Sequence, residues 1–185
     1  MSVPHDIQVL TATDLKPLRA MLSLFGRAFE DPETFEAQPP SDDYLRGLLQ
    51  SEFFVAIAAL RGQQVIGGIT GYVLPKYERA RRELYIYDLA VAEAHRRAGV
   101  ATALIGEARR LAGQRGIDGI FVQADLGDGP AIALYGKLGR KAEVLHFDIE
   151  PEAAPGTSLL ALERPATPSA ASLAVTPIGT VRAAR

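Results

Sequence analysis

The sequence predicts an α/β (α+β) fold in which a mixed β-sheet carries helices on both faces. Two observations lead to this prediction. Apolar stretches with strand-like patterning alternate with segments whose apolar residues recur every three or four positions, as on one face of a helix. Their order along the chain is strand, two helices, three strands, helix, strand, helix and strand, which suits helices packed on both sides of one sheet.

Length and composition exclude several classes of protein. With 185 residues and 48% hydrophobic content, the chain is long enough for one domain with a sizeable core. A net charge of -2 argues against a nucleic-acid binder that works through a basic surface. The sequence lacks an apolar run of membrane-spanning length and a signal-peptide pattern, so we expect a cytoplasmic protein. The absence of cysteine and the wide spacing of the histidines argue against a metal site.

The N-terminal part of the chain predicts one strand and two helices. Residues 7–11 alternate like a short strand, and Thr11 or Thr13 is placed to cap the helix that follows. Residues 31–40, rich in proline and acidic side chains, predict a loop. Ser41 is placed to cap a second, short amphipathic helix. The first helix has one apolar face, formed by Leu15, Leu18, Leu22, Phe25 and Phe29.

Three strands are predicted next. Residues 53–60 are apolar throughout, and an Arg-Gly turn signal joins them to residues 64–74 as a hairpin. Pro75 is expected to end the second strand, and the charged residues 76–82 are expected to form a loop. The second strand contains three glycines, which mark either simple bends or places where another chain or a ligand approaches closely. These are Gly67, Gly68 and Gly71.

The third strand and the turn after it, residues 84–102, hold the clearest functional signal. The strand, residues 84–91, is apolar or aromatic except for Asp88, and a carboxylate is costly to bury without partners. The turn places two arginines, a glycine and small residues at the start of a helix. Free backbone N–H groups and the helix dipole favour an anion such as a phosphate there. A carboxylate close to such a turn predicts an active site.

The C-terminal part of the domain predicts two further helices and two strands. The helix that begins at the turn is expected to run to about Gln114, and residues 117–125 to form the next strand. Asp128 is placed to cap a short helix that ends at Gly139, before a last strand over residues 141–149. We expect a domain over residues 1–151 and, because of its Ala, Pro, Ser and Thr content, a largely disordered tail over residues 152–185.

The turn and a later segment together resemble the GCN5-related N-acetyltransferase (GNAT) superfamily. Its phosphate-binding signature, Gln/Arg-x-x-Gly-x-Gly/Ala, is matched by Arg96, Gly99 and Ala101. A second superfamily pattern, Asn-x-x-Ala-x-x-Leu-Tyr-x-x-x-Gly, is matched from Asp128 to Gly139, with Asp128 where asparagine is more usual. The resemblance implies the GNAT fold, a mixed and mostly antiparallel central sheet flanked by helices on both faces.

A closer resemblance is to the type I aminoglycoside 3-N-acetyltransferases. It covers roughly residues 7–151 and is carried by the segments YVLPKYE, YIYDLAV, HRRAGVATALI, VQAD, ALYGKLG and HFDIEP. In that family the strand also reads Tyr-Ile-Tyr-Asp-Leu-Ala-Val, and an aspartate also replaces the asparagine near the short helix. The resemblance implies an acetyl-CoA-dependent enzyme that acetylates the 3-amino group of an aminoglycoside and thereby confers antibiotic resistance.

The same resemblance assigns roles to single residues. Asp88 corresponds to the carboxylate that meets the attacking amine, as a direct base, through a water or as an orienting anion. Tyr135 corresponds to the group that protonates or stabilises the departing thiolate, and the N–H of Leu89 to the donor to the thioester oxygen. Without a cysteine or a Gly-x-Ser-x-Gly elbow, direct transfer in a ternary complex is expected. Acetyl-CoA, with no metal, is expected to contact Leu89, Ala90, Val91, Arg96, Arg97, Ala98, Gly99, Val100, Ala101, Thr102, Asp128 and Ala131.

The acceptor site is expected to be acidic, because an aminoglycoside is polycationic. Acidic side chains that can line it are Asp42, Asp43, Glu78, Glu83, Asp125, Asp148 and Glu150. The predicted substrate-binding residues are Tyr87, Asp125, Asp148 and Glu150. Asp148 and Glu150 are favoured because the segment HFDIEP matches the last strand of the family.

Other interpretations of these residues and of the function stay open at this point. Asp88 can be a strand carboxylate satisfied by a backbone N–H, Arg96 and Arg97 can be a solvated pair, and Tyr135 can be a core residue. The alternative functions are acetylation of another polyamine or of a protein amine, and a non-catalytic acyl-CoA-binding module. Homodimers are common in the superfamily, so a homodimer is one expected assembly, whereas no nucleic-acid or membrane partner is expected.

Overall fold

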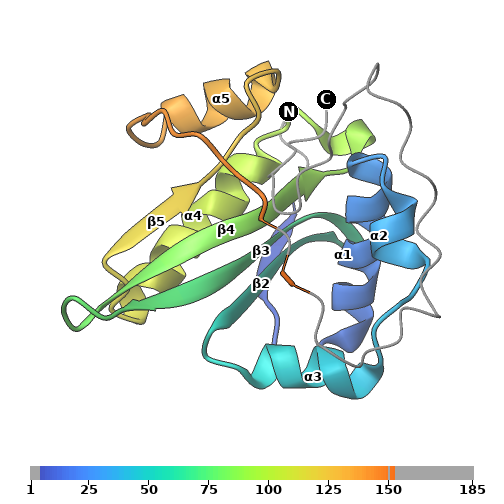
Figure 1. Cartoon of the computed structure of the whole chain (residues 1–185). Helices are drawn as coiled ribbons and strands as arrows, with labels where there is room; N and C mark the ends of the chain where they lie inside the picture. The colour runs from blue at the N-terminus through green and yellow to red at the C-terminus, as the bar shows by residue number, and fades with distance from the viewer. Residues whose placement is uncertain (1–4, 150, 153–185) are drawn as a thin grey trace. The chain divides into compact units, whose positions relative to one another are not determined.

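A mixed five-stranded sheet organises the computed structural model, which describes residues 5–149, 151 and 152 (Figure 1). The first four strands are antiparallel to their neighbours, and the fifth is parallel to the fourth. This arrangement confirms the predicted mixed, mostly antiparallel sheet. In spatial order the strands are β1 (Asp6–Val9), β2 (Phe54–Arg61), β3 (Gln64–Lys76), β4 (Arg81–Val91) and β5 (Gly119–Val122).

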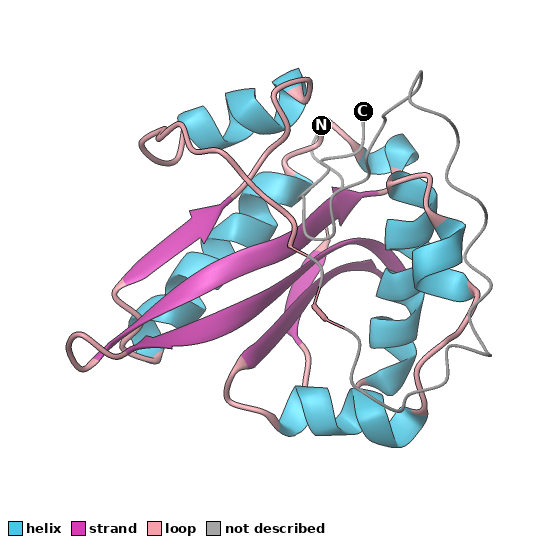
Figure 2. Ribbon diagram, viewed as in Figure 1, coloured by secondary structure: helices cyan, strands magenta, loops and turns pink. Residues whose placement is uncertain are grey.

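Helices cover both faces of this sheet (Figure 2). One face packs against α1 and the other against α4, so the predicted fold class is confirmed. A short 3₁₀ turn, η1 (Glu93–His95), connects β4 to α4. The helices are α1 (Leu15–Ala28), α2 (Pro32–Glu36), α3 (Asp42–Gln50), α4 (Val100–Gln114) and α5 (Gly129–Gly136).

The sequence of β2 shows why helices are needed on both faces. Side chains of a strand alternate between the two faces of a sheet. Ala56 and Ala58 pack in the cluster formed with α1, whereas Val55 and Ile57 pack in the cluster formed with α4. The strand is therefore buried on both sides, which explains its uniformly apolar sequence. Each fully buried Val, Ile, Leu or Phe side chain stabilises such a core by about 1.5–3 kcal/mol.

The glycines of β3 lie where other parts of the chain approach closely. A Cβ added at Gly68 would lie 2.6 Å from the Cε atom of Met21 on α1. A Cβ added at Gly71 would lie 2.7 Å from the backbone oxygen of Tyr85 on β4. Real Cβ atoms do not come this close to other heavy atoms, so Gly68 and Gly71 permit close packing within this chain, which neither predicted interpretation had specified.

The start of α1 differs from the prediction. Asp14, rather than Thr11 or Thr13, occupies the N-cap position. The Asp14 carboxylate accepts hydrogen bonds from the backbone N–H of Thr11, at 2.8 Å, and from its hydroxyl, at 2.7 Å. Thr11 therefore stabilises the turn before the helix instead of capping it. Ser41 caps α3 as predicted, because its side chain accepts a hydrogen bond from the N–H of Tyr44.

Two segments predicted as loops contain regular structure. The short helix α2 forms inside residues 31–40, because Asp31 caps it and Pro32 suits its first turn. Pro75 does not end β3, since it pairs with Arg82 and the hairpin continues to its turn at residues 77–80. Charged side chains around that turn then form ion pairs, as Arg81 does with Glu78 and Glu83.

The C-terminal elements are shorter than predicted. β5 covers only part of residues 117–125, and α5 ends at Gly136 instead of Gly139. Residues 141–149 were predicted as a strand but have no regular structure, and no described strand pairs with them. An alternating pattern alone does not make a strand, because the backbone needs a partner for its hydrogen bonds. The larger apolar side chains of this segment are exposed: Val144, Leu145, Phe147 and Ile149.

The described residues belong to two units, one that extends to Lys141 and one that begins at Ala142. The predicted tail, apart from Glu152, lies outside the described residues, as do Glu150 and the short apolar stretch 159–162 within that tail. In the part of the chain that the structure describes, no helix is long and apolar enough to cross a membrane.

Replacement of Gly71 tests the close approach of β3 to β4. We expect Gly71→Ala to lower the free energy of unfolding by about 1–3 kcal/mol, because the new methyl group would press on the backbone of Tyr85. Urea unfolding measures the change. Gly106→Ala is the matched control, since nothing lies within 4 Å of its added Cβ in α4, and it should be neutral or stabilising by up to about 1 kcal/mol. Equal stability of both variants would contradict the interpretation.

Candidate active site

β4 carries a bulge beside Asp88. Asp88 pairs with Thr70 on β3, but the next pair along the ladder joins Ile86 to Gly71, so Tyr87 is an extra residue in the register of β4. A bulge of this kind bends the strand and changes where its side chains point. Ile86 and Leu89 pack in the cluster with α4. The two residues between them, Tyr87 and Asp88, therefore both face the other side of the sheet.

β4 and β5 separate at the same place. Their parallel pairing ends at Ile86 and Val122, whereas β4 continues to Val91 (Figure 1). Within the described residues, no strand pairs with residues 87–91 on this side. A strand edge without a neighbour offers backbone N–H and C=O groups to a ligand. The predicted donor-binding residues Leu89, Ala90 and Val91 lie on this stretch.

Asp88 is partly buried and hydrogen-bonded. The hydroxyl of Thr70, itself buried, donates to Oδ2 of Asp88 at 2.7 Å. Burial raises the pKa of Asp88 to about 6, and the hydrogen bond from Thr70 opposes part of this increase. The folded chain therefore holds this proton more tightly than the unfolded chain does. The contribution of Asp88 to stability falls as the pH rises from about 4 to about 6.

Sequence patterns indicated Asp88 but not Thr70. Threonine is common in strands, and nothing in the sequence shows which residue of β3 pairs with Asp88. The bulge decides this pairing. The donor to the Asp88 carboxylate is therefore the side chain of Thr70, whereas the alternative interpretation expected a backbone N–H.

The turn before α4 has the geometry of an anion site. Arg97 and Gly99 have positive φ values of 62° and 83°, which turn the chain sharply into the helix. Gly99 is the N-cap, and no side chain caps the helix, so the first N–H groups of α4 are available to a ligand. Arg96 donates from Nε to the carbonyl of Val91 at 3.2 Å, which ties this turn to the end of β4. Arg97 and Thr102 are exposed.

α5 brings Tyr135 to the core that α4 shares with the sheet. The Tyr135 hydroxyl is buried and has no hydrogen-bond partner among the described residues. Burial, with a smaller effect of Asp128, raises its pKa far above its usual range, so the phenol stays protonated. A buried hydroxyl without a partner costs about 1–3 kcal/mol. This cost is removed if a ligand accepts the hydrogen bond.

Asp128 and Ala131 have a structural role in α5. The Asp128 carboxylate accepts a hydrogen bond from the N–H of Ala131 at 3.0 Å and caps the helix as predicted. Both residues are buried. An aspartate therefore performs the capping for which asparagine is also suited.

Aromatic side chains extend from Asp88 across the sheet. Tyr87 lies edge-on to Tyr72 and to Tyr85, with ring centroids 5.5 Å and 5.7 Å apart. Tyr85 stacks on Phe121 with centroids 4.8 Å apart and ring planes 7° apart. Burial raises the pKa values of Tyr72 and Tyr85, with smaller effects of Tyr87 and Asp88. The sequence singled out Tyr87 alone, because alternating aromatic residues are typical of any half-buried strand.

The acidic residues predicted to bind the acceptor lie in different parts of the chain. Asp125 is partly buried in the loop between β5 and α5. Asp148 belongs to the second unit, where its Oδ1 lies 3.2 Å from Nε2 of His146, and Glu150 lies outside the described residues. Several other acidic candidates are paired with arginines: Asp42 with Arg19, Asp43 with Arg46, and both Glu78 and Glu83 with Arg81.

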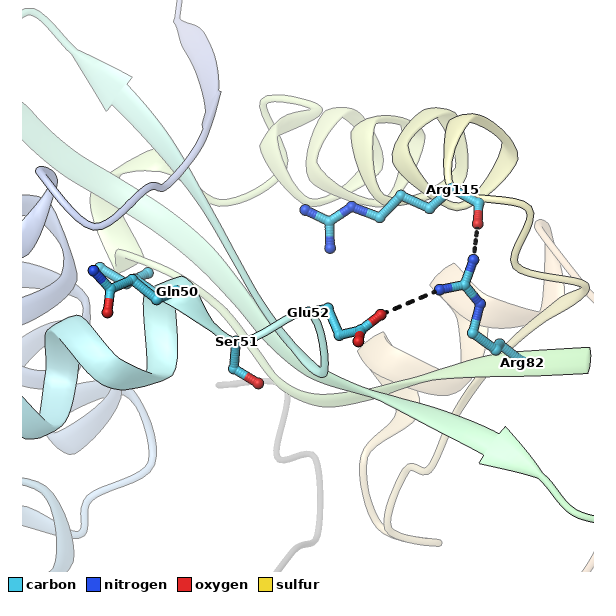
Figure 3. A pocket seen from close by; sticks show the side chains of 6 residues that line it. Gln50, Ser51, Glu52, Arg82 and Arg115 are labelled. Carbon is cyan, nitrogen blue, oxygen red and sulfur yellow. Dashed lines mark hydrogen bonds and ion pairs between the residues drawn. The ribbon is translucent and has the colours of Figure 1, made fainter.

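Two open hollows are found away from the bulge. One, of about 390 Å³, is bounded by Phe121 and Glu83. The other, of about 350 Å³, lies near the start of β4 (Figure 3), where Arg82 donates to the backbone oxygen of Arg115 and lies 3.8 Å from the Glu52 carboxylate. Six residues of strand, about 20 Å, separate Arg82 from Asp88, so this second hollow is not part of the site. No group of three or more potential metal ligands occurs in the described part of the chain.

Comparisons with known proteins agree with this geometry. A family model described as the Acetyltransferase (GNAT) family matches residues 18–139. The crystal structure of the aminoglycoside acetyltransferase HMB0005, from an uncultured soil metagenomic sample, is 48% identical, with a TM-score of 0.79 over 81% of this chain and 100% of that one. No curated protein matches the chain.

A second aminoglycoside acetyltransferase from an uncultured soil metagenomic sample, meta-AAC0020, has been solved with two ligands. Its complex with sisomicin is 30% identical to this chain, and its complex with trehalose 31%. Both have a TM-score of 0.74 and cover 80% of this chain and 97% of that one.

Replacement of Thr70 tests the hydrogen bond to Asp88. We expect Thr70→Val to raise the pKa of Asp88 above about 6, because it removes a hydrogen bond that favours the carboxylate. A ¹³C NMR titration of the carboxyl carbon measures this pKa directly. Thr70→Ser keeps the hydroxyl and should leave the pKa close to that of the unchanged protein. An equal pKa in all three proteins would show that Thr70 does not act on the carboxylate.

Proposed function

This chain belongs to the acetyltransferase (GNAT) family, and we propose that it acetylates the 3-amino group of an aminoglycoside's deoxystreptamine ring with acetyl-CoA as donor. The observation that carries the proposal is the position of Asp88, a partly buried carboxylate with a pKa of about 6 at the point where β4 and β5 separate. A carboxylate with this pKa is ionised at neutral pH. Its pKa is also close enough to neutral pH for the group to exchange a proton with an amine.

The residues between the bulge and the first turn of α4 fit the donor. Enzymes of this family use acetyl-CoA, which supplies the acetyl group as a thioester when bound. Arg96, Arg97 and the uncapped start of α4 suit the pyrophosphate. Gly99 leaves space for its approach, because no atom lies within 4 Å of an added Cβ. The edge of β4 beyond its last pair with β5, at residues 87–91, suits the amide groups of the pantetheine arm.

Each reacting group then has a residue of this chain beside it. We assign Asp88 to the incoming amine, whose proton it accepts directly or through a water, while Thr70 holds one carboxylate oxygen. The N–H of Leu89 is the proposed donor to the thioester oxygen. The hydroxyl of Tyr135, protonated and without a partner in the described structure, is the proposed donor to the departing sulfur. No covalent enzyme intermediate is required.

The acceptor class is supported by similarity and by the site. HMB0005, 48% identical, and meta-AAC0020 are aminoglycoside acetyltransferases, and the latter has been solved with sisomicin and with trehalose. Both of those ligands are built from linked rings. We extend this class to the present chain because a carboxylate beside several aromatic rings suits a cationic, ring-containing amine. The 3-amino regiospecificity rests on the motif resemblance to the type I enzymes. Acetylation at that position would give resistance to the drug.

A thiol-release assay tests this function. The purified full-length chain should release free thiol from acetyl-CoA with gentamicin or sisomicin, and NMR of the product should place the acetyl group on the 3-amino nitrogen. An aminoglycoside whose 3-amino group is already acetylated is the control and should give no release. Turnover with a protein amine but with no aminoglycoside would contradict the proposed acceptor. Tight acetyl-CoA binding without any turnover would support a binding module instead.

Substitutions of Asp88 and Gly99 should separate catalysis from donor binding. Asp88→Asn should lower kcat by roughly 10²-fold or more with little change in acetyl-CoA affinity, because it removes a proton acceptor. Gly99→Asp should instead weaken acetyl-CoA binding, because it places a negative side chain at a position with a φ of 83° beside the phosphate site. Steady-state kinetics and calorimetry measure the two effects.

The pH profile provides the control for the role of Asp88. Because its pKa is about 6, kcat/KM should fall as the pH is lowered through 6, when the carboxylate is protonated. Asp88→Asn should lack this acid limb. Unchanged turnover in Asp88→Asn would show that another group accepts the proton.

A further inference from the structure

We propose that Tyr72, Tyr85, Tyr87 and Phe121 form an aromatic platform that holds the rings of the acceptor beyond the ring that is acetylated. This inference rests on the proposed function and extends it from the reacting amine to the rest of the substrate. The platform would determine which acceptors are used, because it favours molecules with linked rings over a single aminocyclitol.

The four rings lie on one face of the sheet. Phe54, whose ring centroid is 5.6 Å from that of Tyr72, packs in the cluster with α1. Ile86, between the two tyrosines of β4, packs in the cluster with α4. Strand alternation therefore puts the β4 tyrosines on the same face as Tyr72. Phe121 pairs with Tyr85 in the parallel register and stacks on its ring, which places it on this face as well.

The helices that the structure describes leave part of this row exposed. Tyr72 is 37% exposed and Phe121 is 39% exposed, whereas their neighbour Phe54 is only 8% exposed. A row that existed only to build the core would be buried along its whole length. A row of contacting rings that continues from Asp88 and is exposed at Tyr72 and Phe121 instead marks a surface that binds a ligand. Its continuity with the proposed amine site identifies the occupant as the remainder of the acceptor.

The chemistry of the row suits an aminated sugar ring. Aromatic faces attract ammonium groups and pack against the apolar C–H face of a saccharide. The side chain of Asp88 adds a negative charge at one end of the row. At the other end Phe121 and Glu83 bound the hollow of about 390 Å³, where the charge of Glu83 is balanced by Arg81 and Lys76. The aromatic faces and the Asp88 carboxylate therefore favour a cationic acceptor over an acidic one.

The length of the row exceeds one ring. Tyr85 is three residues from Asp88 along β4, which corresponds to about 10 Å of strand, and Phe121 lies one strand further across the sheet. A ring whose amine is at Asp88 contacts Tyr87 but does not extend to Phe121. The Tyr85–Phe121 pair is therefore available to a second or third ring of the same acceptor.

Kinetics with acceptors of different size test the platform in the full-length chain. The probes are 2-deoxystreptamine, which is a single ring, and sisomicin, which carries further rings. In Phe121→Ala the ratio of kcat/KM for sisomicin to kcat/KM for 2-deoxystreptamine should fall about tenfold, mainly through a higher KM for sisomicin. Phe121→Tyr should restore the ratio. Tyr77→Ala removes a fully exposed tyrosine from the β3–β4 turn and should leave the ratio unchanged.

The outcomes separate the platform from the proposed function. If the unchanged protein acetylates both probes and Phe121→Ala keeps the ratio, the platform is wrong and the function stands. If no aminoglycoside is acetylated, the proposed function is wrong. The platform is then tested by an NMR titration of the protein with sisomicin. Shifts of the Phe121 and Tyr72 ring signals would support the platform, and unchanged signals would overturn it. Tyr72→Leu, which removes a different ring, gives the same kinetic test should Phe121→Ala not fold.

Discussion

The bulge of β4 at Tyr87 is the feature on which the rest of the site depends. One extra residue in this strand turns Tyr87 and Asp88 to the same face and aligns Asp88 with Thr70, whose hydroxyl lies 2.7 Å from it. The bulge also coincides with the end of pairing between β4 and β5. A regular strand in this position would direct Asp88 toward the apolar cluster shared with α4, where an ionised carboxylate is very costly.

Two helices on opposite faces hold this strand in place. α1 and α4 bury both sides of β2 and β3, and the small residues Gly68 and Gly71 allow Met21 and the backbone of β4 to come close. Arg96 then joins the end of β4 to the turn before α4. The proposed amine site on β4 and the proposed phosphate site at the start of α4 are therefore joined by this hydrogen bond as well as by the short segment of chain between them.

Part of this site is less stable than ordinary core. Burial raises the pKa of Asp88 to about 6, and the Tyr135 hydroxyl is buried without a partner in the described residues. Each of these features costs free energy in the protein without ligands. Groups of this kind concentrate at functional sites, where a bound molecule satisfies them. The proposed aromatic platform follows the same logic, because an acceptor would cover the exposed rings of Tyr72 and Phe121.

Sequence patterns were sufficient to predict those elements that depend on residues close together in the chain. The helical repeats, the caps at Ser41 and Asp128, and the strand that carries Asp88 were predicted correctly. The sequence did not determine which residues of different strands meet: the alignment of Thr70 with Asp88 and the stacking of Phe121 on Tyr85 depend on strand register. Register joins residues far apart in the chain, and a shift by one residue moves a side chain to the other face. For this reason the sequence by itself identified Asp88 as a candidate site residue, whereas only the tertiary structure determined which side chains surround it.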